Sequence, residues 1–355
     1  MPLPAAFPEA HCNRAAALFE LAQPQAAIEA CEQALSLAPD YADARLAQGM
    51  FHLQRGEYAA GWPAYEWRTK TARRTGEREV GSRRWRGEDD LQGRSLLIHA
   101  EQGLGDTIQF CRYAHLAQEQ GARVVLLVPG TLVALLRTLA PTIEVLADGS
   151  GPVPACDFHC PMLSLPYAFR TTLESIPSQV PNLGAQPDRI ARWRASTGLH
   201  GLRVGVAWQT SAAGGLQDRS FPIELLAPLA ALPGVRLISL QKGAGAADHA
   251  GRAVELGIEV LSADFDAGPD AFVDTAAVMT SLDLVISRDT AVAHLAGALG
   301  RPAWIALKHV ADWRWLVQRT DSPWYPSLRL FRQPRRGDWG NVLAAMRCEL
   351  ERITT

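Results

Sequence analysis

The sequence predicts an α/β protein with two Rossmann-like halves that face each other across a cleft, preceded by a short all-α domain. The first seventy residues are rich in alanine and leucine and follow a helical pattern. From Arg94 onward, short continuous apolar runs alternate with helical patterns, which is typical of strands covered on both faces of a parallel sheet. This alternation stops between residues 177 and 200 and then starts again, which indicates two separate sheets.

The composition is that of a globular protein with several compact units. The chain has 355 residues, of which 48% are hydrophobic and 20% charged, so it is too long for one ordinary core and too apolar for disorder. A net charge of −2 argues against a dedicated nucleic-acid-binding protein, because such proteins carry a basic excess. Lysines are rare among the basic residues, so a lysine in a pocket stands out; they are Lys70, Lys242 and Lys308.

The chain carries no pattern typical of a membrane span or a secretion signal. Its most apolar stretch, residues 124–147, is interrupted by Pro129, Arg137 and Pro141. The first residues lack the basic and apolar regions of a signal peptide, so we expect a cytoplasmic protein with reduced cysteines. Cys156 and Cys160 have no second cysteine pair that would complete a zinc site, and we expect no bound metal.

Residues 1–70 contain two rounds of a helical pattern. At an offset of 34 residues, Ala15 aligns with Gly49 and Ala27 with Gly61, and these are the small positions at which paired helices touch. This period and these small residues resemble tetratricopeptide repeats, and a generic helical bundle is the alternative. Two repeats are fewer than usually stand alone. We therefore expect them to pack on the rest of the chain, and they are too short to wrap an extended peptide by themselves. The presence of the repeats favours a protein acceptor or partner that docks through them.

A change in composition follows the repeats. Between residues 68 and 94 there are nine basic and five acidic residues, together with four glycines. We interpret this segment as a solvated basic linker, and contact of its positive charge with an anionic ligand is the alternative. The expected domains are the repeats (1–70), the basic linker (71–93), a first half (94–185), a second half (186–335) and a terminal helix (336–355).

The two halves are defined by their apolar runs. Ligands of parallel sheets bind beyond the carboxyl ends of the strands, so chemistry is expected in the turns at those ends. Helices are expected at 106–120 and 131–139 in the first half. The expected strands are 95–100, 123–128, 143–146 and one within 157–169 in the first half, and 202–207, 235–240, 258–261, 284–287 and 303–306 in the second.

The first strand of the first half ends in the turn Glu101-Gln-Gly-Leu-Gly-Asp106. The turn begins like a dinucleotide fingerprint, but Ile108 occupies the third glycine position, which disfavours hydride transfer. Asp106 is expected at the start of a helix, where aspartate is a good cap. The alternative is a general base at the floor of the cleft, which accepts a proton from a hydroxyl group.

A strand end in the second half, Ser287-Arg-Asp-Thr-Ala-Val-Ala-His294, leads into a helix of small residues. Asp289 or Thr290 is expected to cap this helix. The N–H groups at 290–292 and the positive end of the helix form an anion site, for which a diphosphate is the natural ligand. His294 lies one turn into the helix and is either an ordinary helix histidine or a donor to a phosphate or ribose.

Gly-Leu-Gly-Asp at 103–106, together with the run from Asp289 to Gly300, resembles the heptosyltransferase-like glycosyltransferases of family 9. The resemblance covers about residues 94–345. It is nearest to bacterial proteins in which this module follows tetratricopeptide repeats, a group similar to flagellin-modifying glycosyltransferases. Further matching runs are 99–110, 157–166, Asp312-Trp-Arg-Trp-Leu316 and Asp321-Ser-Pro-Trp-Tyr-Pro326.

The resemblance implies a GT-B fold whose first half binds the acceptor and whose second half binds a nucleotide-sugar, without a metal. It implies that Asp106 is the general base and that the turn at 289–291 and His294 contact the donor. It also implies a terminal helix that crosses back onto the first half. The candidate donor-binding residues are Gly105, Trp208, Gln209, Gln241, Lys242, Arg288, Asp289, Thr290, Ala291 and His294.

One segment departs from the family pattern. Trp208-Gln209-Thr210 stands where heptosyltransferases often have a lysine or serine near the donor, and the loop 212–218 is rich in glycine. Arg219 and Ser220 match the relatives. This departure is the observation that favours a protein that binds a nucleotide without turning it over.

Two further patterns are discounted. Asp264-Phe-Asp266 spells the metal-binding motif of another transferase fold, but a three-residue match is expected by chance and the surrounding architecture differs. Four tryptophans near the C-terminus could stack on a sugar or base, but packing between helices is the favoured interpretation. They are Trp313, Trp315, Trp324 and Trp339.

The expected function is an inverting, metal-independent glycosyltransferase that moves a sugar from a nucleotide-sugar to an acceptor hydroxyl on a protein. One alternative is an enzyme of the lipopolysaccharide heptosyltransferase type. Another is a catalytically degenerate module that binds a nucleotide-sugar and recruits a partner through its repeats. A nucleotide-sugar epimerase on the same fold would need further acid–base residues, for which the sequence offers no convincing set.

Overall fold

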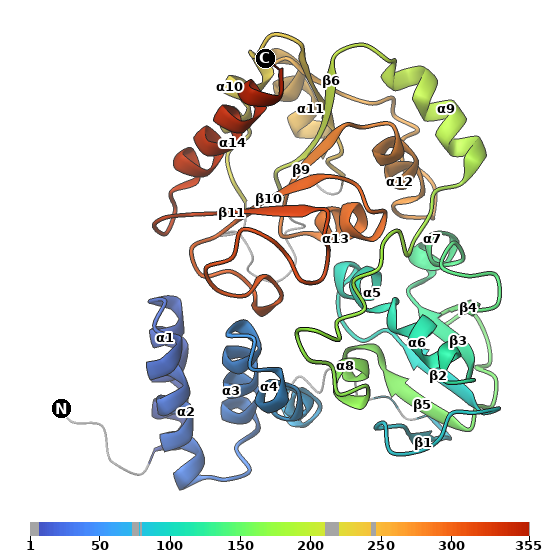
Figure 1. Ribbon diagram of the computed structural model, residues 1–355, viewed down its shortest axis with the longest axis vertical. Helices are drawn as coiled ribbons and strands as arrows, with labels where there is room; N and C mark the ends of the chain where they lie inside the picture. The colour runs from blue at the N-terminus through green and yellow to red at the C-terminus, as the bar shows by residue number, and fades with distance from the viewer. Residues whose placement is uncertain (1–6, 73–77, 79, 210–219, 243–245, 355) are drawn as a thin grey trace.

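The computed structural model describes residues 7–72, 78, 80–209, 220–242 and 246–354. Figure 1 shows three parts: the N-terminal helices, a first sheet with its helices, and a second sheet with its helices above the other two. Within the described residues every strand pair of the two sheets is parallel. The expected fold class, two α/β halves preceded by helical repeats, is confirmed.

The N-terminal part consists of two helix pairs, α1 (Pro8–Glu20) with α2 (Pro24–Leu37) and α3 (Ala42–Gln54) with α4 (Tyr58–Tyr65), and ends in the 3-10 helix η1 (Glu66–Lys70). The small residues lie where these pairs touch. A Cβ atom at Gly49 would lie 2.7 Å from the backbone nitrogen of Tyr65, and one at Gly61 would lie 2.6 Å from Cδ2 of Leu53. Any larger side chain would therefore push α3 and α4 apart.

The first half contains, in the part of the chain that is described, a five-stranded sheet of order β1-β5-β2-β3-β4. Strand β1 lies in the segment expected to be a linker, and its two residues pair with Phe158 and His159. A strand of two residues is too short to show a period, so no pattern in the sequence predicts it. The strands are β1 (Arg83–Arg84), β2 (Ser95–His99), β3 (Arg123–Val128), β4 (Glu144–Ala147) and β5 (Phe158–Pro161).

The helix expected over 106–120 is divided into α5 (Leu104–Phe110) and α6 (Tyr113–Glu119). The Nε atom of the buried Arg112 donates to the carbonyl of Gln109 at 2.8 Å. In a continuous helix this carbonyl would accept from the backbone of residue 113. The other helical segments of this half are η2 (Gly130–Leu132), α7 (Val133–Leu136), η3 (Met162–Ser164) and α8 (Leu165–Ala168).

The second half has, in its described residues, a six-stranded sheet of order β11-β10-β9-β6-β7-β8. The edge strand β11 is additional to the expected strands. The strands are β6 (Leu202–Ala207), β7 (Val235–Ser239), β8 (Ile258–Glu259), β9 (Leu284–Arg288), β10 (Ala303–Leu307) and β11 (Leu328–Arg332). The helices are α9 (Pro187–Thr197), η5 (Ile223–Leu226), α10 (Ala227–Ala230), α11 (Ala246–Glu255), α12 (Val273–Thr280), α13 (Ala291–Ala298), η6 (Trp313–Trp315) and α14 (Trp339–Thr354).

The terminal helix α14 stays on the second half. It contacts η5, α10, β10 and β11, which all belong to that half. Its apolar stripe, Val342, Leu343, Met346 and Leu350, is buried in the core shared with these elements. The expectation that this helix crosses back onto the first half is therefore wrong, because its apolar face is already covered where it stands.

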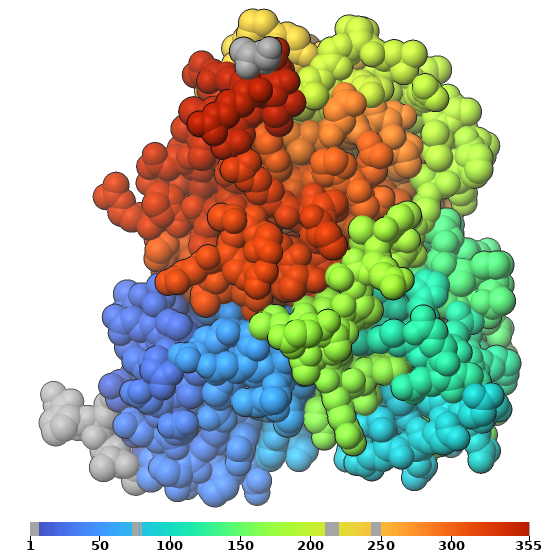
Figure 2. Space-filling view, in the orientation of Figure 1, coloured from blue at the N-terminus to red at the C-terminus, as the bar shows by residue number. Residues whose placement is uncertain are grey.

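An aromatic cluster joins the three parts. The indole of Trp62 in α4 meets that of Trp313 edge to face at 5.4 Å, and Trp313 also lies near Phe110 of α5. The Nε1 atom of Trp62 donates to the carbonyl of Thr171 at 2.9 Å. In Figure 2 the blue repeats lie directly below the orange-red second half and beside the green first half. The expectation that the repeats pack on the rest of the chain is confirmed. The four late tryptophans are buried in the hydrophobic cores, as expected for packing residues.

Candidate active site

A cavity of about 590 Å³ lies between the two halves at the carboxyl ends of their strands. Residues 103–106 after β2 contribute from one side, and residues 289–292 after β9 contribute from the other. The ends of β6 and β7, the segment before α12, and Thr131, Asp312 and Arg314 line the rest of the cavity. This is the position at which parallel sheets bind their ligands. Of the candidate residues, the cavity is lined by Gly105, Asp106, Gln209, Gln241, Lys242, Asp289, Thr290, Ala291 and His294.

Asp106 lies in the first turn of α5, three residues after the N-cap residue Gly103, and its carboxylate has a partner on each oxygen. Its Oδ2 atom accepts from the backbone N–H of Gly103 at 2.9 Å, which caps the first turn of α5. Its Oδ1 atom lies 2.5 Å from Nη2 of Arg314, which comes from η6 in the second half. The Asp106 side chain keeps 20% of its surface exposed and lines the cavity. The carboxylate is therefore held in place and still accessible.

Arg314 lines the cavity and is one of the residues of this site that the sequence did not single out. Its Nη1 atom donates to Asp312 at 2.8 Å and its Nε atom to Gln109 at 3.0 Å. Its guanidinium carbon lies 4.2 Å from the centre of the Trp313 ring. Burial opposes its charge, but the carboxylates of Asp312 and Asp106 more than offset this and hold its pKa above the ordinary value. The matching run at 312–316 was the available signal, but nothing in the sequence linked it to Asp106.

The start of α13 supplies the opposite wall of the cavity. Thr290 is the N-cap residue in an extended conformation, and Ala291 begins the helix. The first N–H groups of a helix have no partner within it, so they are available to an anion. A Cβ atom at Gly105 would lie 3.4 Å from Cα of Ala291 and 3.0 Å from Cδ2 of His294. The absence of a side chain at Gly105 thus lets α5 and α13 approach across the two halves.

His294 is held by its neighbours inside the protein. Its Nδ1 atom lies 3.1 Å from the hydroxyl of Tyr325, and its ring stacks on Trp315 with 5.4 Å between the ring centres. Burial, reinforced by the positive charge of Arg314, lowers the pKa of His294 to about 3. The ring is therefore neutral at physiological pH. One edge of the residue still contributes to the cavity wall.

Gln241 organises the ends of β6 and β7. Its Oε1 atom accepts from the backbone N–H groups of Trp208 at 3.1 Å and Gln209 at 2.9 Å. The next residue, Lys242, donates from Nζ to the carbonyl of Phe265 and lines the cavity. Lys242 is thus the lysine that the structure brings to the candidate site.

Two of the candidate donor-binding residues lie away from the cavity lining. Trp208 is buried in the second hydrophobic core. Arg288 is also buried, with its guanidinium carbon 5.3 Å from the centre of the Trp339 ring and a hydrogen bond of 3.3 Å to Ser220. Thr210, the loop 212–218 and Arg219 lie outside the described residues.

The discounted Asp264-Phe-Asp266 motif has a structural role. Asp266 accepts from the backbone of Asp274 at 2.8 Å and from the Thr275 hydroxyl at 2.5 Å, at the start of α12. Asp264 pairs instead with Arg192. Within the described residues, no group of three or more His, Cys, Asp or Glu side chains is arranged to hold a metal ion.

The comparisons with known proteins agree with this architecture. The family model of the tetratricopeptide repeat matches residues 8–41, which cover α1 and α2. Protein FlbA of Caulobacter vibrioides is 31% identical over 376 residues, and the match covers 96% of this chain. The chain spans 61% of the length of that relative. No helix in the described segments has the length and apolar character needed to cross a membrane.

Three solved structures that are similar to this chain are glycosyltransferases. ADP-heptose LPS heptosyltransferase II of E. coli is 12% identical, with a TM-score of 0.51 over 72% of this chain and 99% of that chain. A glycosyltransferase of family 9 from Veillonella parvula is 10% identical, with a TM-score of 0.50 over 69% of this chain and 87% of that chain. TibC of enterotoxigenic E. coli, an iron-containing dodecameric glycosyltransferase, is 15% identical, with a TM-score of 0.50 over 75% and 78%. The chain therefore has the GT-B fold of family 9 glycosyltransferases, with a tetratricopeptide region at its start.

Proposed function

We propose that this protein is an inverting, metal-independent glycosyltransferase that moves a sugar from a nucleotide-sugar to an acceptor hydroxyl. The observation that carries the proposal is the cavity in which Asp106 of one half and the start of α13 of the other line the same space. The diphosphate of the donor lies at residues 289–291, where the helix end offers N–H groups and a partial positive charge. The acceptor enters from the side of Asp106.

The reaction is a single displacement. The acceptor oxygen attacks the anomeric carbon while the bond from that carbon to the phosphate oxygen breaks, and its electron pair leaves with the nucleoside diphosphate. Asp106 accepts the proton of the hydroxyl group as the new bond forms. Attack from the face opposite the leaving group inverts the anomeric configuration.

The charge that develops on the leaving diphosphate needs positive partners near the donor. The start of α13 provides part of this charge, and the Lys242 ammonium at the end of β7 lines the same cavity. The guanidinium of Arg314 is hydrogen-bonded to the carboxylates of Asp106 and Asp312, so its role is to orient the base rather than to bind the diphosphate. Positioning and electrostatic stabilisation then supply most of the rate acceleration.

We propose a protein as the acceptor. The match to the tetratricopeptide repeat supports this, because such repeats commonly form protein-binding surfaces. Mass spectrometry of proteins from cells with and without this chain tests it. A protein that gains a hexose- or heptose-sized mass only in the presence of the active chain is the expected result. Modification of a lipopolysaccharide core alone would favour the heptosyltransferase alternative.

One observation favours a second function, a module that binds a nucleotide-sugar without transferring it. Both carboxylate oxygens of Asp106 already accept hydrogen bonds, from Gly103 and Arg314. Calorimetric titration with a panel of nucleotide-sugars, with hydrolysis followed in the same samples, separates the two functions. Binding with release of nucleoside diphosphate supports the enzyme, whereas binding without any turnover, in the presence of acceptor, supports the module.

A further inference from the structure

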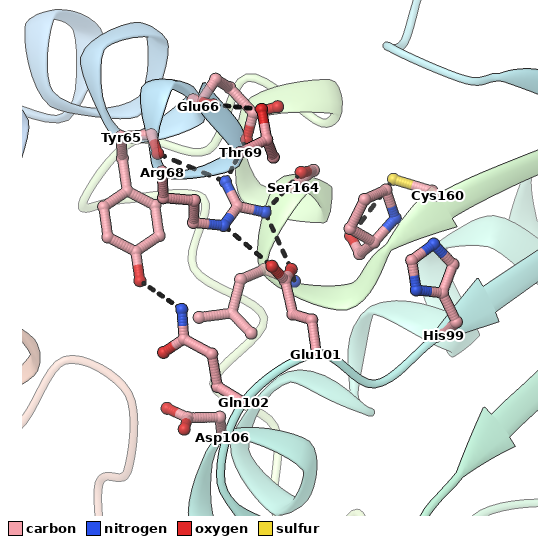
Figure 3. Close-up of polar contacts among 12 residues, drawn as sticks. Tyr65, Glu66, Arg68, Thr69, His99, Glu101, Gln102, Asp106, Cys160 and Ser164 are labelled. Atoms are coloured by element: carbon pink, nitrogen blue, oxygen red, sulfur yellow. Dashed lines mark hydrogen bonds and ion pairs between the residues drawn. The ribbon is translucent and has the colours of Figure 1, made fainter. Parts of the chain in front are cut away.

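The last turn of the repeats contacts the turn that leads to Asp106. Arg68 of η1 is buried and forms two parallel hydrogen bonds to Glu101, from Nε at 2.9 Å and from Nη2 at 2.8 Å. Figure 3 shows this guanidinium between Glu66 above and Glu101 below, with Asp106 further along the same turn. Both side chains of the pair are 1% exposed.

Glu101 and its neighbour Gln102 are fixed from several sides. Besides Arg68, Oε1 of Glu101 accepts from the backbone N–H of Leu163 at 2.9 Å. Nε2 of Gln102 donates to the hydroxyl of Tyr65 at 3.3 Å (Figure 3). The next residue, Gly103, donates to the Asp106 carboxylate. The repeats thus hold Glu101 and Gln102, the two residues before Gly103, which is the N-cap of α5 and bonds to the candidate base Asp106.

The repeats also support the other partner of Asp106. The Trp313 ring, on which Arg314 lies, meets Trp62 at 5.4 Å and Tyr65 at 5.7 Å between ring centres. Residues of α4 and η1 therefore contact both the turn that carries Asp106 and the ring beneath its ion-pair partner. A repeat region that served only to dock a protein partner would not require contacts with the turn that carries Asp106 or with the Trp313 ring.

We propose that Arg68 is a positioning residue for Asp106, so that the repeat region is a structural component of the active site. The catalytic meaning of this proposal rests on the proposed glycosyl transfer. The paired hydrogen bonds to Glu101 fix the turn at 101–103, and the turn fixes the carboxylate against the acceptor. Since the donor-binding wall at 289–291 belongs to the second half, loss of Arg68 affects the chemical step more than donor binding.

The test compares two arginines of one network, of which Arg68 is buried and Arg84 is partly exposed. Arg84 donates from Nη2 to Glu66 at 2.6 Å and to Ser164 at 2.8 Å, and Arg68 bonds to the same two residues. In the described part of the chain, Arg84 has no hydrogen bond or ion pair to Glu101. Arg68→Met and Arg84→Met therefore each remove one positive charge from the same network, and only the first releases the turn.

Hydrogen exchange of peptides that cover 100–106 measures the turn without any need for activity. We expect exchange in Arg68→Met to be faster by about tenfold or more, with little change in Arg84→Met. For transfer, we expect kcat of Arg68→Met to fall by about tenfold or more while KM for the donor stays near the wild-type value. Arg68→Lys keeps the charge but not the paired geometry, and it should recover part of kcat.

Each outcome decides the proposal. Equal exchange in the two methionine variants, or equal loss of kcat, would show that Arg68 acts only through general stability and would overturn it. If Arg68→Met does not fold, Arg68→Lys and Arg84→Lys give the same comparison. If the wild type transfers no sugar, the proposed function fails, and hydrogen exchange alone decides whether Arg68 holds the turn.

Discussion

Arg314 and Asp106 form an ion pair across the two halves, with 2.5 Å between Nη2 and Oδ1. The arginine belongs to the second half and the aspartate to the first, so the pair exists only when the cleft is assembled. The guanidinium restricts the Asp106 carboxylate to one orientation at the edge of the cavity.

Asp106→Asn should retain nucleotide binding and lose transfer. The asparagine keeps the size of the side chain and, through its single carbonyl oxygen, the cap of α5. Its amide nitrogen then faces Arg314 and cannot accept the proton, so we expect the transfer rate to fall by about 10²–10⁴-fold. Calorimetry measures the affinity for nucleoside diphosphate, and release of product measures the rate. Asp312→Asn removes the negative charge of the other carboxylate that pairs with Arg314 and serves as the control, with a smaller effect. An Asp106→Asn variant with full activity would exclude Asp106 as the base.

Removal of one N–H group at the start of α13 should weaken donor binding. Ala291 is the first residue of the helix and follows an extended Thr290, a setting that accepts proline. Ala291→Pro should therefore fold and lower the affinity for nucleoside diphosphate by about tenfold, because a hydrogen bond to a charged group is lost. Ala291→Gly retains the N–H group and is the control. Equal affinities of the two variants would contradict a diphosphate site at this helix end.

A side chain at Gly105 should disturb the contact between α5 and α13. Gly105→Ala would place Cβ only 3.0 Å from the His294 ring, so we expect the free energy of unfolding to fall by about 1–3 kcal/mol. Urea denaturation measures this change. Gly251 lies within α11 and has open space around it, so Gly251→Ala should instead raise stability by about 0.5–1 kcal/mol. Similar effects at both positions would argue against a tight contact at Gly105.

Stability should fall as the pH drops below about 6.5, the pKa of an unfolded histidine. Burial, together with the nearby His159 at 3.4 Å, lowers the pKa of His99 to about 3. Between these two values the unfolded chain binds a proton that the folded protein does not, so protonation favours unfolding. From pH 7 to pH 5 this histidine should remove about 2 kcal/mol of the free energy of unfolding.

Urea denaturation of wild type and His99→Gln at both pH values checks this dependence. The lowered pKa of His294 reduces the free energy of unfolding on acidification in both proteins. The difference between their losses of stability therefore isolates His99. The variant should lose less stability than the wild type on acidification. An identical loss in both proteins would mean that His99 is protonated in the folded state.

Local patterns in the sequence predicted much of the fold. The small residues at 15, 27, 49 and 61 located the contacts of the paired helices, because close approach of two backbones depends on the size of single side chains. Apolar runs located the inner strands, which are covered on both faces. Strand β1 was not predicted, because it consists of two arginines whose pairing with β5 depends on residues seventy-five positions away.

The candidate site, like the fold, could be predicted from the sequence only in part. Asp106 and the turn at 289–291 follow strands, and parallel topology brings strand ends to one edge, so their meeting in one cavity could be expected from sequence. Trp208 and Arg288 also stand at strand ends, yet they are buried away from the cavity. Side chains alternate between the two faces of a sheet, and which face meets the cleft depends on how the halves pack.

The sequence by itself determined the helical repeats, the two parallel sheets and the turns that carry Asp106 and Thr290, because each follows from local periodicity and turn chemistry. Only the tertiary structure decided that Arg314 pairs with Asp106, that Arg68 holds Glu101, and that α14 remains on the second half. These are contacts between residues distant in the chain. They depend on how apolar faces are covered when the three parts assemble, and no short-range pattern records that outcome.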